Sequence, residues 1–177
     1  MTKLLGLSGS LRAASYNTML VNAAARSFAP DHFQMADLRL PLYDNDLEDK
    51  GMPDSVATLC DQIRWADALI FATPEYNKGP SGVMKNALDW ISRAKPWVTE
   101  GKPTAVLTAT AGMAGGQRAK SAMYLYLIPF RVQLVLDPEV NIGGAASKFD
   151  AAGNLTDEAS QKFLGQLMDA LKAAVRA

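Results

Sequence analysis

The chain has 177 residues, of which 49% are hydrophobic and 20% are charged, as expected for one soluble globular domain. Lys plus Arg equals Asp plus Glu, and this zero net charge excludes a general nucleic-acid binder, which needs a basic excess or a basic face. The single cysteine, Cys60, cannot form an internal disulfide or hold a zinc or iron–sulfur centre alone. The sequence also lacks an apolar run of membrane-spanning length and a secretory leader, so we expect a cytoplasmic protein with no membrane partner.

The spacing of apolar residues predicts strands and helices in strict alternation. Five apolar runs indicate buried strands, at 3–8, 33–38, 68–73, 104–110 and 131–136. Amphipathic patterns predict helices at 17–28, 53–65, 82–92, 117–127 and 157–176. We expect Asn17 or Thr18 to cap the first helix, and Phe163 to lie on the inward face of the last. The segments 41–53, 74–81, 111–116 and 143–154 are predicted to be loops.

This alternation predicts an α/β fold, because parallel strands need crossover connections and helices supply them. Five strands favour a flavodoxin-like three-layer α/β/α sandwich with a five-stranded parallel sheet of order 2-1-3-4-5. No repeat or linker divides the sequence, so residues 1–177 are expected to form a single domain. Ligands of such sheets bind beyond the carboxyl ends of the strands, here between the first and third strands.

The loop after the first strand has the composition of an anion site. Gly9 permits a tight turn, Ser10, Ser15 and Asn17 offer short donors, and Arg12 adds a charge-assisted fork. The N–H groups and dipole of the following helix favour an anion as well. The alternative is an ordinary capped turn with Arg12 in solvent. The position after the first strand favours phosphate, although neither a Walker A nor a G-x-G-x-x-G pattern is present.

The second distinctive loop, 74–82, contains two prolines and two glycines, which fix its path. Such a loop can present backbone groups edge-on to a planar heterocycle, and Tyr76 supplies an aromatic face. The alternative is a structural turn with a half-buried tyrosine. Glu75 is either a catalytic acid or a surface, helix or interface contact, and we favour the contact.

Three motifs together resemble the NADPH-dependent FMN reductase family, which includes NAD(P)H:quinone, azo-dye and chromate reductases. They are G-S-L-R-x-x-S-x-N at 9–17, P-E-Y-N at 74–77 and K-N-A-L-D-W at 85–90. The resemblance extends over most of the chain. It implies a flavodoxin-like fold, bound FMN, NADPH or NADH as co-substrate, and a homodimer or homotetramer.

The resemblance also implies which residues hold the cofactor. At the phosphate end these are the residues of the first loop and the helix start, with Leu11 acting through its backbone: Ser10, Leu11, Arg12, Ser15, Tyr16 and Asn17. Along the isoalloxazine ring they are Pro74, Glu75, Tyr76 and Asn77. The family usually places a serine after the fourth strand, where this chain has Thr110, Ala111 and Gly112. We expect Thr110 to replace that serine.

The expected activity is hydride transfer from NAD(P)H to flavin N5, followed by reduction of a small-molecule acceptor in a ping-pong cycle. The acceptor would be a quinone, free flavin, an azo compound or chromate. No catalytic side chain and no metal are predicted, since His32 is expected at a surface turn and the acidic stretch 44–49 in a solvated loop. One alternative is a flavodoxin-like electron carrier, which the neutral charge disfavours. Another is a nucleotide-binding protein without redox use.

Four further residues are singled out by the sequence. For Cys60 we expect a structural role, and for the other three a functional and a structural interpretation are both open. Cys60 lies on an apolar helix stripe and is expected in the core. Trp90 either packs in the core or lines a subunit interface, and the resemblance favours the interface. Lys78 and Arg118 either meet the 2′-phosphate of NADPH or remain solvated.

Overall fold

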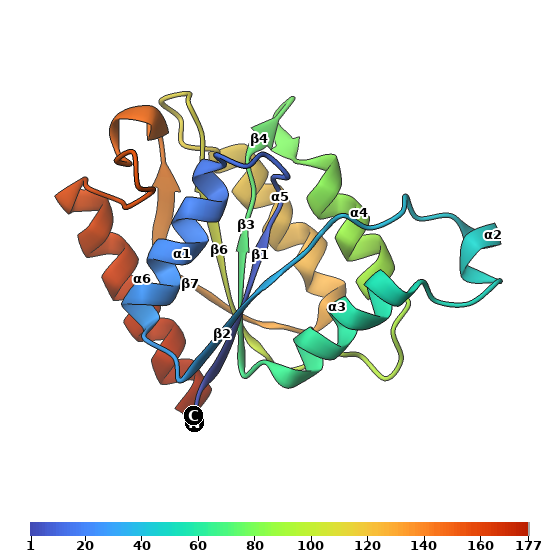
Figure 1. The fold of residues 1–177 in the computed structure, drawn as a ribbon. Helices are drawn as coiled ribbons and strands as arrows, with labels where there is room; N and C mark the ends of the chain where they lie inside the picture. Colours follow the sequence, from blue (N-terminus) through green and yellow to red (C-terminus); the bar gives the residue numbers. More distant parts are fainter. Residues whose placement is uncertain (177) are drawn as a thin grey trace.

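The fold is known from a computed structural model that describes residues 1–176. Its centre is a five-stranded, all-parallel sheet of order β2-β1-β3-β6-β7 (Figure 1). The strands are β1 (Lys3–Ser8), β2 (His32–Ala36), β3 (Ala68–Ala72), β6 (Pro103–Ala109) and β7 (Gln133–Ile142). The predicted order 2-1-3-4-5 is confirmed. The fourth and fifth strands of the sheet carry the labels β6 and β7, because β4 and β5 form a separate hairpin.

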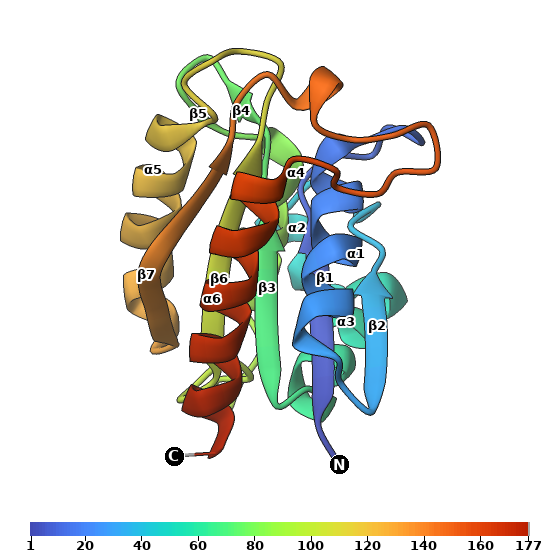
Figure 2. The same cartoon turned by 90° about the vertical axis from the view of Figure 1, so that its left-hand side faces the viewer.

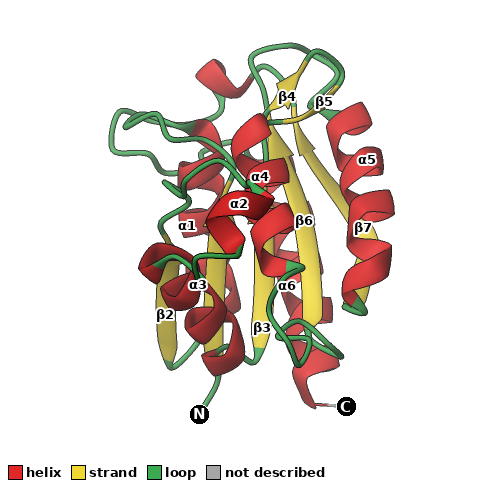
Figure 3. Ribbon diagram, turned by 90° about the vertical axis from the view of Figure 1, so that its right-hand side faces the viewer, coloured by secondary structure: helices red, strands yellow, loops and turns green. Residues whose placement is uncertain are grey.

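Helices cover both faces of the sheet and make a three-layer sandwich. One face carries α1 (Tyr16–Phe28) and α6 (Glu158–Arg176), seen in front in Figure 2. The other carries α3 (Asp54–Trp65), α4 (Gly82–Ile91) and α5 (Gln117–Leu127), as Figure 3 shows. Each face has its own apolar core, and consecutive residues of β1 alternate between them, Leu4 on the first and Leu5 on the second. A strand buried on both faces must be apolar throughout, which explains the continuous apolar runs.

Several short elements lie inside segments predicted as loops. The acidic stretch 44–49 contains α2 (Asn45–Glu48), which begins because the Asp44 side chain accepts a hydrogen bond from the Asp46 N–H at 3.0 Å. The loop after β3 contains the hairpin β4 (Glu75–Tyr76) and β5 (Gly79–Pro80). Two single turns of 3₁₀ helix occur at Ile128–Phe130 and Ala145–Ser147.

The last strand extends further than predicted, to Ile142 instead of residue 136. The apolar run ends at Leu136 because Asp137 is charged and Pro138 has no N–H for the ladder. A register shift between Ala105 and Leu107 of β6 accommodates the interruption, and pairing resumes at Leu107–Val140. The edge position of β7 tolerates the proline.

Two predictions about helices are wrong: the residue that caps α1 and the place of Phe163 on α6. The cap of α1 is Ser15, whose hydroxyl accepts a hydrogen bond from the Thr18 N–H at 3.3 Å, and neither Asn17 nor Thr18 has this role. Phe163 is 50% exposed, because α6 buries Leu164 and the residues one and two turns beyond it instead. By contrast, Cys60 is buried and His32 is exposed, as predicted.

Trp90 lies in the core, so its predicted place at a subunit interface is wrong. It is fully buried, and its Nε1–H donates to the Pro41 carbonyl at 2.8 Å. Asn86 donates to the same carbonyl at 3.0 Å and accepts from the Tyr43 N–H at 2.8 Å. The K-N-A-L-D-W motif therefore fastens the loop after β2 onto α4. None of the helices within residues 1–176 has the length and apolar character needed to cross a bilayer.

Candidate functional site

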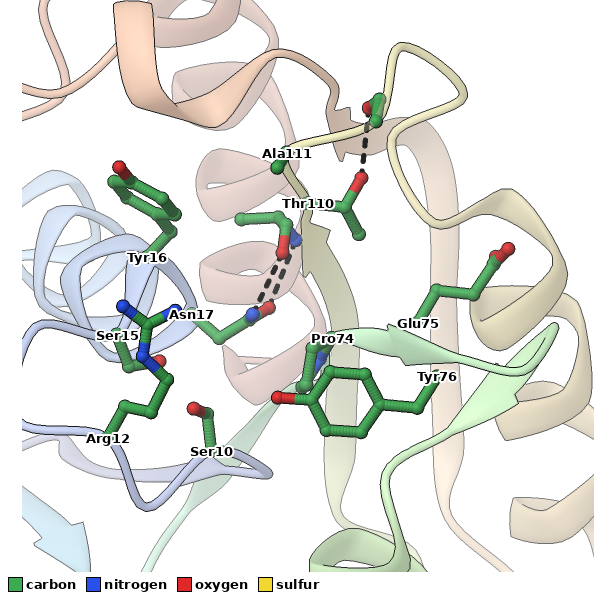
Figure 4. Close-up of a pocket in the computed structure, with 12 residues that line it drawn as sticks. Ser10, Arg12, Ser15, Tyr16, Asn17, Pro74, Glu75, Tyr76, Thr110 and Ala111 are labelled. Carbon is green, nitrogen blue, oxygen red and sulfur yellow. Dashed lines mark hydrogen bonds between the residues drawn. The ribbon is translucent and has the colours of Figure 1, made fainter.

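A cavity of about 290 Å³ lies at the carboxyl ends of β1, β3 and β6, where the sequence places the ligand site. Figure 4 shows the side chains of three loops converging on it. The lining residues are Ser10, Arg12, Ser15, Tyr16, Asn17, Pro74, Glu75, Tyr76, Ala109, Thr110, Ala111 and Gly112. Two of the predicted site residues do not line it: Leu11 lies in the adjoining cavities, and Asn77 is exposed at the tip of the β4–β5 hairpin.

The first loop is held close against its neighbours. The Gly9 N–H donates to the Ala72 carbonyl at 2.7 Å, and the Gly9 carbonyl accepts from the Ser81 hydroxyl at 2.5 Å. A Cβ at position 9 would lie 2.8 Å from the Ser81 Oγ, so this close approach requires glycine. Ser81 also caps α4, since its Oγ accepts from the Met84 N–H at 3.2 Å. One serine therefore joins the first loop to the loop that contains Tyr76.

The cavity is suited to an anion at the start of α1. The first turn of this helix carries no acidic side chain, so its N–H groups face the cavity without a competing carboxylate. The Ser15 hydroxyl accepts from Thr18, which leaves its own proton to donate. Arg12 is exposed and forms no ion pair with any carboxylate in residues 1–176. Its guanidinium lies beside Ser15 and Tyr16 at the cavity (Figure 4).

Asn17 has a structural role that sequence reasoning missed. Its Nδ2 donates to the Ala109 carbonyl at 2.9 Å, and its Oδ1 accepts from the Ala109 N–H at 3.0 Å (Figure 4). From the sequence this amide is expected at the phosphate, whereas both of its polar atoms are bonded to Ala109 at the end of β6. The side chain thus fixes the spacing between the start of α1 and the loop after β6.

Glu75 is a helix contact, the interpretation favoured from the sequence. Its Oε2 accepts from the N–H groups of Arg118 at 3.0 Å and Ala119 at 3.1 Å. These groups begin α5, whose N-cap residue, Gly116, has no side chain to satisfy them. Glu75 supplies that cap from the hairpin, so its carboxylate is directed at the helix. Tyr76, 53% exposed, stands at the mouth of the cavity.

The loop after β6 is braced from inside. The Thr108 hydroxyl donates to the Gly115 carbonyl at 2.6 Å, and a Cβ at position 143 would collide with the Met113 carbonyl. The Thr110 hydroxyl donates to the Gly112 carbonyl at 3.0 Å. Thr110 is expected from the sequence to replace the family's serine near the flavin, but its hydroxyl proton is used in a hydrogen bond within its own loop.

Lys120 is a buried cation that the sequence analysis did not identify. It is 1% exposed, and its Nζ lies 3.8 Å from the Glu139 Oε2. Burial lowers the pKa of Lys120 to about 8, and the largely exposed Glu139 opposes this shift only in part. Burial, with Glu139 adding to it, raises the pKa of Tyr124 to about 12. The sequence contains a signal for this burial, because Lys120 has the helical spacing that places it on the inward face of α5 with Met123 and Leu127.

The geometry fits a planar heterocycle that carries a phosphate. One end of the cavity offers hydroxyl, guanidinium and helix N–H donors, and the other offers Pro74, the face of Tyr76 and a rigid loop. These donors fit the phosphate of FMN. Within residues 1–176 no three His, Cys, Asp or Glu side chains come together as metal ligands.

Comparison with known proteins agrees with this geometry. A family model described as NADPH-dependent FMN reductase matches residues 2–147. An NAD(P)H-dependent FMN reductase of Pseudomonas aeruginosa is 42% identical over 176 residues, covering 98% of this chain and 95% of the relative. A 2-hydroxy-1,4-benzoquinone reductase of a Burkholderia species is 40% identical over 174 residues, covering 95% and 93%.

A solved flavoenzyme structure has the same fold as this chain. The flavoenzyme NAD(P)H:(acceptor) oxidoreductase FerB of Paracoccus denitrificans superposes with a TM-score of 0.89 at 31% identity, covering 99% of this chain and 98% of that one. The chain therefore belongs to the NADPH-dependent FMN reductase family and is an oxidoreductase that uses FMN and NAD(P)H.

Proposed function

We propose that the chain is one FMN-binding domain that passes electrons from NAD(P)H to a quinone or a related small acceptor. The observation that carries this proposal is the cavity, with phosphate donors at one end and Tyr76 at the other. FMN supplies the hydride chemistry when it is bound. Relatives described as quinone reductases, including one of Pseudomonas putida at 37% identity, support a quinone as acceptor. Free flavin, azo compounds and chromate are further candidates.

The chain's own residues bind and orient. Ser10, Arg12, Ser15 and the first N–H groups of α1 hold the phosphate. The loops around Pro74 and Thr110 fix the plane of the ring. Tyr76 leaves the mouth open to solvent, so NAD(P)H and the acceptor use the same opening in turn, which is a ping-pong order. The lone buried Cys60 suits a reducing compartment, and we place the protein in the cytoplasm.

Anaerobic stopped-flow absorbance tests this proposal. The FMN-loaded protein should lose its oxidised-flavin band on mixing with NADPH and regain it when benzoquinone is added. Initial rates over a matrix of both substrates should give parallel double-reciprocal lines. A flavin that stays oxidised would indicate an electron carrier instead. A protein that acquires no flavin absorbance after incubation with FMN would overturn the proposal.

Arg12→Ala should weaken FMN binding, because it removes a charge-assisted contact to phosphate worth roughly 1.5–3 kcal/mol. The dissociation constant, measured by quenching of FMN fluorescence, should rise by about 10- to 100-fold. Arg26→Ala, in the last turn of α1 and therefore at the end of the helix far from the cavity, is the matched control and should bind FMN like the wild type. Equal affinity of the Arg12 variant and the control would remove Arg12 from the phosphate site.

We also propose that the chain forms a homodimer or homotetramer through a groove between α4 and α5. The groove, about 350 Å³, is lined by Leu88, Leu125, Tyr126 and Pro129, with Lys85 and Asp89 at its edge. Leu125 is 67% exposed, and contiguous exposed apolar surface of this kind marks interaction sites. Lys85 and Asp89 at its edge pair with each other at 2.6 Å, so the groove presents an apolar surface without net charge, which suits the same surface of a second copy related by a two-fold axis. Sedimentation equilibrium of the wild type and Leu125→Asp measures the assembly, and the variant should be monomeric.

A further inference from the structure

Two more cavities continue the site along the outer side of the first loop. One, of about 380 Å³, shares Ser10 and Arg12 with the cavity described above. The next, of about 510 Å³, shares Leu11, Leu38 and Arg39 with that second cavity. The three cavities therefore adjoin one another in order from Tyr76, past the phosphate donors, to the carboxyl end of β2, and this row of adjoining cavities is called the trough below.

The middle of the trough is cationic. Arg39 lies on the loop after β2, where its NH1 is 3.1 Å from the Asp37 Oδ1 and its NH2 donates to the Leu11 carbonyl at 3.4 Å. These contacts place the guanidinium against the first loop and use two of its five N–H donors. Arg12 and Arg39 line this cavity with one carboxylate, Asp37. Because Arg12 is assigned to the phosphate of FMN, Arg39, whose NH1 also contacts Asp37, is the cation that remains for a second anion.

The far end of the trough is apolar. The third cavity is lined by Leu11, Leu38, Leu42 and Val83, together with the Arg39 that borders the cationic part. Adenosine 2′-phosphate matches this arrangement, because its negatively charged phosphate lies on the ribose, next to a flat and weakly polar base. In dinucleotide-binding folds, which differ from this flavodoxin-like sheet, an acidic residue after the second strand meets the ribose 2′-OH of NAD, whereas a nearby arginine accommodates the 2′-phosphate of NADP, so the parallel here is one of position alone. Asp37 directly follows β2 here, and Arg39 comes two residues later.

We propose that Arg39 binds the 2′-phosphate of NADPH, with the adenine on the apolar surface of Leu11, Leu38 and Leu42. This inference rests on the proposed function, because the nicotinamide must reach the flavin at the other end of the same trough. It assigns to Arg39 the role that sequence analysis considered for Lys78 and Arg118. Neither of those two residues lines any of the three cavities.

Binding of nucleotide fragments tests Arg39 without turnover. Isothermal titration of the FMN-loaded protein with adenosine 2′,5′-bisphosphate and with 5′-AMP compares ligands that differ by the 2′-phosphate alone. The wild type should prefer the bisphosphate, and Arg39→Gln should reduce that preference by about tenfold or more. Arg64→Gln is the matched control, because Arg64 is also exposed and its NH1 is 2.6 Å from the Asp61 carboxylate. It should keep the wild-type preference.

Steady-state kinetics give the second readout. Arg39→Gln should raise the ratio of the KM for NADPH to the KM for NADH by about tenfold. The inference is overturned if the bisphosphate binds no better than 5′-AMP, or if the variant leaves either ratio unchanged. Failure of the proposed function is separate: the flavin would then be reduced by neither nucleotide, whereas the fragment titration would still report on Arg39.

Discussion

Replacing Asn17 with alanine should lower the free energy of unfolding by about 2–6 kcal/mol and weaken FMN binding in the same variant. The mutation removes both hydrogen bonds to Ala109, which is 2% exposed, and leaves its N–H and carbonyl without their partner. Each buried polar group left unpaired costs roughly 1–3 kcal/mol. The start of α1 and the loop after β6 also lose their common anchor, so the donors on either side of the cavity move apart.

Urea unfolding measures the first effect, and FMN fluorescence quenching measures the second. Asn22→Ala is the matched control, because Asn22 lies on the same helix and its side chain makes no hydrogen bond within residues 1–176. The control should stay within about 0.5 kcal/mol of the wild type, as surface substitutions usually do. An Asn17 variant that is as stable as this control would show that the bridge to Ala109 contributes nothing.

Replacing Lys120 with methionine should raise the free energy of unfolding at pH 7 by about 3 kcal/mol. Burial lowers the pKa of Lys120 from 10.5 in the unfolded chain to about 8 in the folded protein. That difference corresponds to about 3 kcal/mol of penalty for holding the charged form in the fold. Methionine has a similar length and no charge, and replacing buried ion pairs by apolar side chains is often stabilising.

The pH dependence has a definite sign. Between pH 8 and about 10.5 the unfolded chain binds more protons than the folded one, so wild-type stability should rise with pH relative to the variant. Below pH 8 both states are protonated, and the full difference should persist. Urea unfolding from pH 6 to 10 measures this, and in the folded protein Tyr124, with its pKa raised to about 12 by burial, stays neutral over that range. Lys162→Met, at an exposed position of α6, is the control and should stay within about 0.5 kcal/mol of the wild type at pH 7. A flat difference for Lys120→Met would contradict the prediction.

The features that could be predicted from the sequence depend on local pattern. The alternation of apolar runs and amphipathic stretches is enough to predict the sheet order, and the sheet order brings the loops around Ser10, Pro74 and Thr110 to one edge. The unpredicted details depend on distant partners. A contact role for Glu75 is favoured from the sequence, but nothing local identifies the helix it caps, which lies 43 residues away, and Asn17 pairs with a backbone 92 residues away. Trp90 was misplaced because an apolar helical stripe looks the same at a core and at an interface.

The hydroxyl of Ser81 gives the cavity a fixed length. It joins the Gly9 carbonyl at the first loop to the first turn of α4, while the Ser81 N–H donates to the Thr73 hydroxyl at the end of β3. The first loop and the loop that contains Tyr76 therefore cannot separate without breaking these buried hydrogen bonds. The distance between the two loops, and with it the length of ligand that the proposed site accepts, is held by this one serine.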